Sequence, residues 1–94
     1  NIAAMVRSAA TALYANNATT ETQRELAESI MRSVGLAVWV DDETKMDAVT
    51  ALSGSGPAYF FLLIEAMQEA AQKLGLSEKE STLLSLQTAL GAAR

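Results

Sequence analysis

The sequence predicts a mainly helical fold, and three observations support this prediction. Half of the 94 residues are hydrophobic, eighteen are alanine and one is proline, a composition that suits closely packed helices and hardly suits a β-sandwich. Apolar residues recur at three- and four-residue spacing through most of the second half. Two capping-box patterns, at Thr20 and Ser77, mark helix starts. A chain of this length forms at most one small domain and buries a smaller share of its surface than an average domain does.

The first 16 residues leave two alternatives open. Helical spacing is followed by Ile2, Met5, Val6, Ala9, Ala10 and Leu13. A shorter set, Thr11, Leu13 and Ala15, alternates as the residues of a strand do. Intrinsic propensity favours the helix.

The next elements have clearer boundaries. A helix is expected over residues 20–34, because Thr20 and Gln23 form a capping box and Gly35 follows the last apolar residue. Residues 36–40 are rich in valine and carry the only tryptophan, which is typical of a strand.

Three further helices are expected after an acidic turn. Asp41 or Asp42 can cap a helix over residues 43–52. The principal helix covers residues 57–74, and the last covers residues 78–94, so that the two form an antiparallel pair.

The apolar surface of these last two helices predicts a homodimer. The first half of helix 57–74 is apolar almost all round, and helix 78–94 adds the leucines at 83, 84, 86 and 90. So short a chain has few layers with which to cover both surfaces, so a second copy is the expected cover. Small residues near the end of helix 78–94 would allow another helix to approach closely, although alanine is also simply a good helix former.

Composition excludes several classes of function. A net charge of −4 with no cluster of Lys or Arg argues against nucleic-acid or anionic-membrane partners. The absence of Cys and His excludes disulfides, thiolate chemistry, histidine bases and nearly all zinc sites. The longest uninterrupted apolar run, residues 58–64, is far shorter than the ~20 residues of a membrane span, and no leader opens the chain. We therefore expect a cytoplasmic protein, and one that is a piece of a longer chain, because the last helical pattern is still running at Arg94.

The Ser-Gly-Ser-Gly-Pro segment, residues 53–57, is the most informative local feature. If Ser55 or Gly56 is the N-cap of the following helix, Pro57 lies in the first turn, where no backbone N–H is needed. The free N–H groups of that turn would then point into a flexible loop and attract a carboxylate or phosphate. The alternative is that the segment only connects two elements.

Polar residues near this segment are candidates for binding, and each has a plainer explanation. Ser53 and Ser55 can bind a carboxylate or an imine nitrogen, but such hydroxyls often satisfy local backbone groups. Thr50 lies one turn earlier, and its hydroxyl can return to a carbonyl of its own helix. Glu43 can hold a cationic amine or iminium, or act as an ordinary first-turn acid. The neighbouring acids lack the glycine-centred spacing of a calcium loop, so we assign no metal site.

Four segments of the chain together resemble the C-terminal part of pyrroline-5-carboxylate reductases. They are DAVTALSGSGPAYFF from Asp47, EAM from Glu65, KLGL from Lys73 and LQTALGAA from Leu86. The similarity continues in register from about Ala10 to Arg94. Members of this family reduce 1-pyrroline-5-carboxylate to L-proline with NAD(P)H.

The resemblance implies two parts and an incomplete catalyst. Residues 1–42 would be a β-α-β remnant of the nucleotide-binding domain, with residues 10–15 extended, and residues 43–94 the helical dimerisation domain, incomplete at its C-terminus. The glycine-rich dinucleotide fingerprint is absent, so this piece alone should bind neither NADPH nor NADH and should be inactive. The sequence does not indicate the catalytic proton donor or which of the two cofactors the intact protein prefers.

The resemblance also assigns roles to particular residues. Glu43 would approach the substrate ring, and the segment with Thr50, Ser53 and Ser55 would line the substrate pocket. Gly54, Gly56 and, weakly, Asn1 would lie near the nicotinamide, although Ile2 and Ala3 depart from the family's usual Thr and Pro after that asparagine.

Three functional hypotheses follow. The first is a segment of a pyrroline-5-carboxylate reductase, with a small-molecule substrate in the intact protein. The second is a stand-alone helical dimerisation module without a small-molecule site. The third is a reductase of similar build that acts on a different imine or keto acid.

Overall fold

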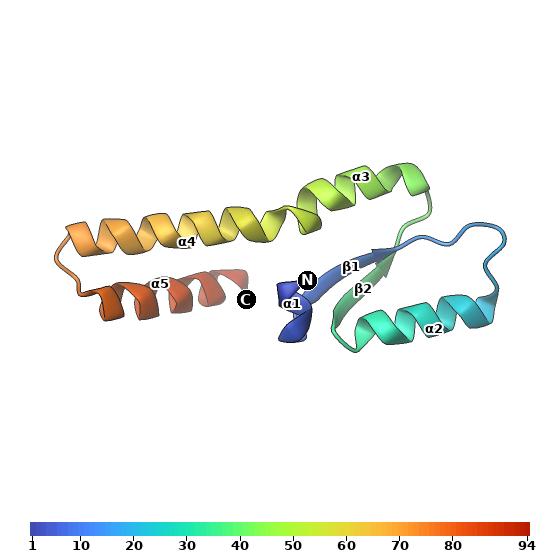
Figure 1. Ribbon diagram of the computed structural model, residues 1–94, viewed down its shortest axis with the longest axis horizontal. Coiled ribbons are helices and arrows are strands. Elements are labelled where there is room, and N and C mark those ends of the chain that lie inside the picture. Colours follow the sequence, from blue (N-terminus) through green and yellow to red (C-terminus); the bar gives the residue numbers. More distant parts are fainter. The chain divides into compact units, whose positions relative to one another are not determined.

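The computed structural model describes all residues, Asn1–Arg94. They form two compact units, residues 1–54 and residues 55–94. The first unit contains the only sheet, and the second is a pair of helices (Figure 1).

The ambiguous N-terminal region contains both a helix and a strand. Helix α1 (Ile2–Met5) is a single turn capped by Asn1, whose Oδ1 accepts a hydrogen bond from the N–H of Ala4 at 3.3 Å. Arg7, with a φ of 56°, ends this turn, and strand β1 (Ala9–Leu13) follows. The alternation of side chains allowed a strand here, the family resemblance favoured one over residues 10–15, and a strand forms at residues 9–13.

The rest of the sheet follows the predicted β-α-β order. Helix α2 (Glu21–Arg32) begins with the predicted capping box of Thr20 and Gln23, and strand β2 (Gly35–Trp39) pairs parallel with β1, Ala9 opposite Gly35 and Leu13 opposite Trp39. Helix α2 packs against β2, and Ala9 and Ala37 are the only buried hydrophobic residues in the chain. The predicted fold class, a short β-α-β element followed by helices, is confirmed.

The two strands approach closely where they begin. A Cβ atom on Gly35 would lie 2.1 Å from the carbonyl oxygen of Ala9, closer than any real contact. The carbonyl of Val34 accepts a hydrogen bond from the N–H of Ala9 at 3.0 Å, which adds one step to the ladder. Glycine at position 35 therefore permits the pairing that makes residues 9–13 a strand.

The predicted helix over residues 43–52 is helical but irregular. Asp42 caps it, its Oδ1 accepting from the N–H of Thr44 at 2.9 Å. A 3₁₀ turn (Glu43–Lys45), helix α3 (Met46–Val49) and a π-helical turn (Thr50–Gly54) then follow one another.

The flexible loop predicted at residues 53–56 is wrong. The π-helical turn reaches Gly54, Ser55 has helical backbone angles (φ −90°, ψ −23°), and α4 (Gly56–Lys73) begins at the next residue. The wider i→i+5 turn accommodates glycine and serine without leaving the helical conformation. The chain therefore passes from α3 to α4 with no extended residues.

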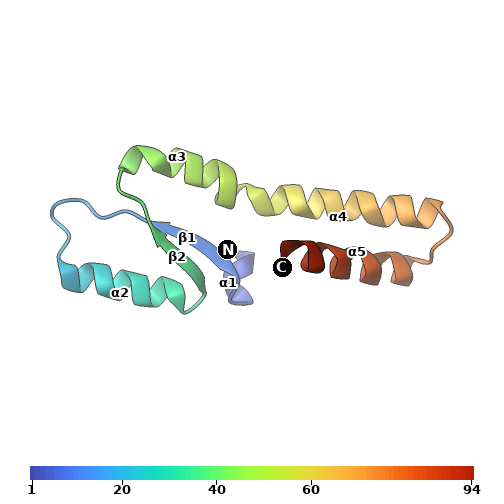
Figure 2. The same cartoon turned by 180° about the vertical axis from the view of Figure 1, so that it is seen from behind.

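The second unit is the antiparallel helix pair that the sequence predicted. Helix α4 ends before Gly75, which has a φ of 107°, and α5 (Glu78–Ala93) starts with the predicted capping box of Ser77 and Glu80. Figures 1 and 2 both show α4 and α5 side by side along their length.

On α5, small residues make the contact with α4. Ser81 and Ser85 are the only buried residues of this unit, and Ala89 on the same face of α5 is half-buried. On α4, Ile64, Met67, Gln68 and Ala71 are half-buried, as is Gly56 at its start. The leucines of α5 and the aromatic residues of α4 lie on other faces and stay largely exposed: Leu83, Leu84, Leu86, Leu90, Tyr59, Phe60 and Phe61.

Candidate functional site

A hollow of about 200 Å³ lies in the first unit between the sheet and the irregular helical segment. Its lining residues are Ala10, Thr11, Ala12, Leu36, Val38, Val49, Leu52 and Ser53. The alternation of each strand places Ala10 with Ala12, and Leu36 with Val38, on one sheet face. The alanines are too small to fill the space beneath the helix, so an almost wholly apolar hollow remains, with Ser53 at its wall.

The hydroxyls of Thr50 and Ser53 turn back onto their own helix. Thr50 Oγ1 donates to the carbonyl of Met46 at 3.0 Å, and Ser53 Oγ donates to the carbonyl of Val49 at 3.1 Å. Both bonds use the hydroxyl proton and leave the oxygen free to accept. Ser53 is half-buried at the hollow, whereas Thr50 is exposed. The structure thus places only Ser53 at this hollow, and the substrate role of both residues stays a prediction.

The helix end expected at residues 54–58 forms in part: α4 begins after Ser55 as its N-cap, with Pro57 in the first turn as predicted, but no flexible loop precedes it. Ser55 makes no side-chain cap, and its carbonyl accepts the N–H of Ala58 at 3.1 Å, one of the groups that the sequence predicted to be free. Gly56 is half-buried, and a Cβ on it would meet nothing within 4 Å, so there is space beside its α-carbon. The N–H of Ala58 is therefore not free, and the first turn of α4 follows the π-helical turn Thr50–Gly54 instead of a loop.

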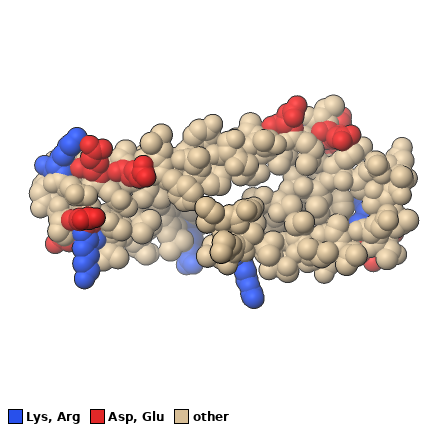
Figure 3. All heavy atoms as spheres, in the orientation of Figure 1, with Lys and Arg blue, Asp and Glu red and all other residues tan.

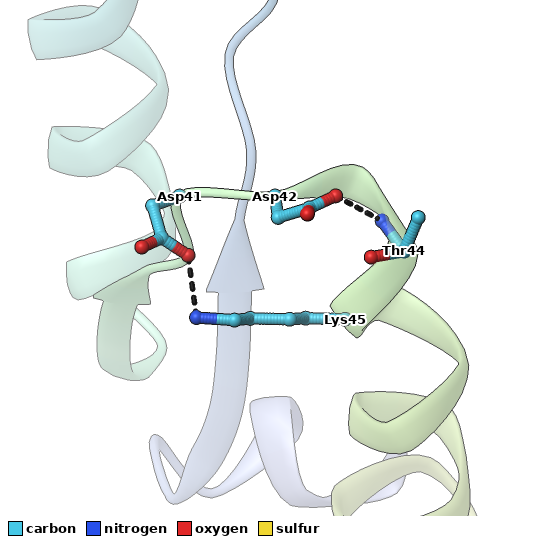
Figure 4. Close-up of polar contacts among 4 residues, drawn as sticks. All are labelled: Asp41, Asp42, Thr44 and Lys45. Carbon is cyan, nitrogen blue, oxygen red and sulfur yellow. Dashed lines mark hydrogen bonds and ion pairs between the residues drawn. The ribbon is translucent and has the colours of Figure 1, made fainter.

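Two residues of the acidic turn, Asp41 and Asp42, accept polar contacts from within the turn (Figure 4). Lys45 Nζ pairs with Asp41 Oδ1 at 2.5 Å, and this bond lowers the pKa of Asp41 and raises the pKa of Lys45. The hydrogen bond from the Thr44 N–H lowers the pKa of Asp42. Glu43 is exposed and makes no side-chain hydrogen bond or ion pair. Its carboxylate is available to a cationic ligand, and no group of three potential metal ligands forms around it.

Charge is unevenly spread along the second unit. The charged residues of α4 lie in its second half, and those of α5 lie in its first turn. Apart from Arg94, which follows α5, the charges of this unit are therefore near the turn that connects the two helices. Figure 3 shows a broad uncharged surface over the rest of these helices. By length and composition alone, the helical run Glu43–Lys73 could also cross a membrane, a test that apolar helices of soluble proteins pass as well. The sequence-based expectation counted only uninterrupted apolar runs. It did not detect this helical run, because single charged residues divide its apolar residues.

Comparison with known proteins identifies the second part of the chain. The family model described as pyrroline-5-carboxylate reductase dimerisation matches residues 43–94. The chain belongs to this family. The domain boundary predicted after residue 42 stays a prediction, since the match begins at Glu43 while the compact units meet after Gly54.

Individual relatives match the whole chain. It is 54% identical over 94 residues to the pyrroline-5-carboxylate reductase of Pseudomonas aeruginosa and 48% identical to that of Haemophilus influenzae, covering all of this chain and 34% and 35% of those proteins. It thus spans about a third of their length.

Solved structures share the fold. A pyrroline-5-carboxylate reductase from Coxiella burnetii matches with a TM-score of 0.88 and 56% identity over 95% of this chain and 33% of that one. The Plasmodium falciparum pyrroline carboxylate reductase, solved with NADP bound, matches with a TM-score of 0.93 and 34% identity over 99% of this chain and 38% of that one.

Sequence reasoning missed one polar contact in the first unit. The guanidinium carbon of Arg24 lies 4.4 Å from the ring centroid of Trp39. The only available signal was an arginine in the first turn of a helix together with the only tryptophan at the end of the next strand. Spacing alone does not reveal such a pair, because the sheet brings the two residues together.

Proposed function

We propose that the chain is the self-association and substrate-side segment of an NAD(P)H-dependent pyrroline-5-carboxylate reductase, which makes L-proline in the cytoplasm. The observation that carries the proposal is the uninterrupted match of all 94 residues, at 54% identity, to a protein of that name. In the intact enzyme a hydride would reduce the C5=N bond of the bound ring.

The partner in this proposal is a second copy of the chain, packed through α4 and α5. The argument rests on exposure: Phe60 is 64% exposed, Leu62 66% and Leu83 58%. Surfaces of this size and apolarity on a monomer usually mark an interface. The contact between α4 and α5 uses the small face of α5, so the leucine face remains for the other copy.

The proposed substrate contacts are Glu43, Thr50, Ser53 and Ser55. The free carboxylate of Glu43 would pair with the ring nitrogen when it carries positive charge, and this pairing would strengthen as water is excluded. The hydroxyl oxygens of Thr50 and Ser53 would accept hydrogen bonds with their protons already engaged. These residues would orient the ring and hold its charge, as expected where a cofactor supplies the difficult step.

A nicotinamide cofactor would supply the hydride. The bare backbone at Gly56 suits the close approach of a flat ring, and Gly54 lies beside it, with room for a Cβ at 3.6 Å from Thr50 Cγ2. Asn1 fits less well, because its side-chain oxygen already caps α1. No strand followed by a glycine-rich turn is present to hold the phosphates, so we propose no cofactor binding by this segment alone.

An assay of the full-length protein that contains this chain tests the proposal. We expect NADPH or NADH to be oxidised in the presence of 1-pyrroline-5-carboxylate, and more slowly with a six-membered cyclic imine or a keto acid. A preference for one of these other substrates would favour a different reductase, and no turnover at all would favour a helical association module.

A substitution at Glu43 tests the site itself. Removing a charge-assisted contact worth about 1.5–3 kcal/mol should raise KM for the imine by roughly 10- to 100-fold in Glu43→Gln. Glu25→Gln, an exposed acid on α2 that also makes no ion pair, is the matched control and should leave KM unchanged. Equal kinetics for the two variants would remove Glu43 from the site.

Flotation with lipid vesicles tests the location. We expect the full-length protein to remain in the aqueous fraction, because α4 and α5 bury their apolar faces against a second copy. Recovery of the protein with the vesicles would indicate instead that the helical run Glu43–Lys73 enters the membrane.

A further inference from the structure

A second hollow, of about 340 Å³, lies in the first unit where both parallel strands end. Its lining residues are Tyr14, Ala15, Arg24, Trp39, Val40 and Asp41. Two of them follow β1, two follow β2, Trp39 is the last residue of β2, and Arg24 comes from the first turn of α2. In parallel sheets the carboxyl ends of strands are the usual place for ligands, and this volume is within the range of small-molecule sites.

The hollow contains a positioned but unpaired guanidinium. Arg24 is half-buried, stacks on Trp39 at 4.4 Å and takes part in none of the three ion pairs of the chain. The capping box at Thr20 fixes the start of α2, and the N–H of Arg24 donates to the Thr20 carbonyl at 3.0 Å. A stacked guanidinium keeps its N–H groups at its edge, where they can form two parallel bonds to a carboxylate.

A carboxylate lines the same hollow. Asp41 is bound by Lys45 from outside the lining, which keeps the pKa of Asp41 below its ordinary value and the side chain ionised at neutral pH. One oxygen is engaged by Lys45, and the second makes no hydrogen bond within the chain. The lining therefore presents the Arg24 guanidinium and the free oxygen of the exposed Asp41 carboxylate, which also pairs with Lys45, beside the Tyr14 and Trp39 rings.

This combination selects a class of ligand. A simple anion at Arg24 would also meet the charge of Asp41, and a simple cation at Asp41 would meet that of Arg24. A small molecule that carries both charges is favoured by both residues. We propose that this hollow binds a free α-amino acid, with its carboxylate on Arg24, its ammonium group beside Asp41 and its side chain against Tyr14 and Trp39. The proposal uses none of the residues assigned above to the substrate.

Calorimetric titration of the full-length protein with L-leucine tests this site. We expect saturable binding, with roughly 10-fold or greater weakening in Arg24→Gln, because a charge-assisted pair is lost. Arg32→Gln is the matched control on the same helix: its side chain pairs with Glu28 in solvent, and the substitution should leave the affinity unchanged. Circular dichroism verifies that both variants retain their helices.

Ligand analogues test whether both charges are read. N-acetyl-L-leucine lacks the ammonium group and isopentylamine lacks the carboxylate, so each should bind at least about 10-fold more weakly than L-leucine. The proposal fails if L-leucine does not bind, if Arg24→Gln binds it as well as the parent protein does, or if inorganic phosphate competes equally, which would indicate an anion site only.

Discussion

The two units of this chain differ in which residues they bury. The first unit encloses two alanines, Ala9 and Ala37, by pairing strands and laying α2 across them. The second unit contains both phenylalanines and eight of the twelve leucines, yet its only buried residues are Ser81 and Ser85. Abundant hydrophobic residues in a segment therefore do not imply a core within that segment.

The difference arises from which residues touch. Serine and alanine on α5 allow the backbones of α4 and α5 to come close, and a close approach turns bulky side chains outward. A helix pair of this kind has little hydrophobic stabilisation of its own, since burial contributes only about 25 cal/mol per Å² of apolar surface. We therefore expect association and helix-pair stability to be coupled in the second unit, while the first unit depends on its sheet.

The largest expected effect is on self-association, when a charge is placed among the exposed leucines of α5 (Leu83, Leu84, Leu86 and Leu90), here called the leucine face. Leu86→Glu should weaken self-association by about 3–6 kcal/mol, roughly 10²- to 10⁴-fold, because a symmetric interface loses the buried leucine of each copy at about 1.5–3 kcal/mol apiece. Sedimentation equilibrium measures the change. Thr22→Glu, at an exposed position of α2 in the first unit, is the control and should have little effect. An unchanged mass for Leu86→Glu would mean that the second unit does not associate through this face.

Glycine substitutions compare the two units next. Gly35→Ala should destabilise the first unit by about 3 kcal/mol, because the new methyl group would meet the backbone of Ala9 at 2.1 Å and force the strands apart. Gly75→Ala has no atom within 4 Å and should cost only about 1–2 kcal/mol for its backbone angle, φ 107°. Denaturant unfolding measures both. We infer that position 35 requires glycine because the two strands come close there, and not only because glycine is flexible. An equal loss of stability in the two variants would contradict this.

Alanine substitutions at two serines one turn apart should change the stability of the helix pair in opposite directions. Ser81 is fully buried and its hydroxyl has no partner, so Ser81→Ala should stabilise the helix pair by about 1 kcal/mol. Ser77→Ala removes a capping box and should destabilise by about 1 kcal/mol. Thermal unfolding followed by circular dichroism measures both shifts. Destabilisation by Ser81→Ala would show that this hydroxyl has a partner, such as water, in solution.

The smallest effect is on the dependence of stability on pH. The Ser77 N–H donates to Glu80 at 2.7 Å and lowers the pKa of Glu80 in the folded state. The ionised Glu80 side chain therefore stabilises the folded state above the ordinary glutamate pKa of about 4.3. This stabilisation is lost as the pH falls through the lower pKa that Glu80 has in the folded state. Glu80→Gln should therefore flatten the acid limb of the stability profile, whereas Glu65→Gln, an exposed unpaired acid, should not. The same acid limb in both variants would contradict the assignment.

The elements that local chemistry defines were predictable from the sequence. Both capping boxes were predicted, because Thr20 with Gln23 and Ser77 with Glu80 act within a single turn. The second strand was predicted to within one residue for a similar reason, since valine and tryptophan between two turns favour extended backbone.

Other features depended on distant partners. Residues 9–13 are a strand because β2 lies beside them, and their own propensity favours helix. The Ser-Gly segment was predicted as a loop from its composition, but the π-helical turn makes it part of a helix. Of the predicted site residues, Ser53 lies at the apolar hollow and Glu43 has a free carboxylate, and their roles stay predictions. The contact between Arg24 and Trp39 was not predictable, because α2 and β2 must first be packed.

By itself, the sequence determined where the helices start and stop and how much apolar surface they carry, because caps and composition act over a few residues. Only the tertiary structure decided which surfaces face inward. In the second unit Ser81, Ser85 and Ala89 take the inner face and leave the leucines outside. Helix α5 carries apolar residues on more than one side, and α4 packs on the side whose small residues let the two backbones come close.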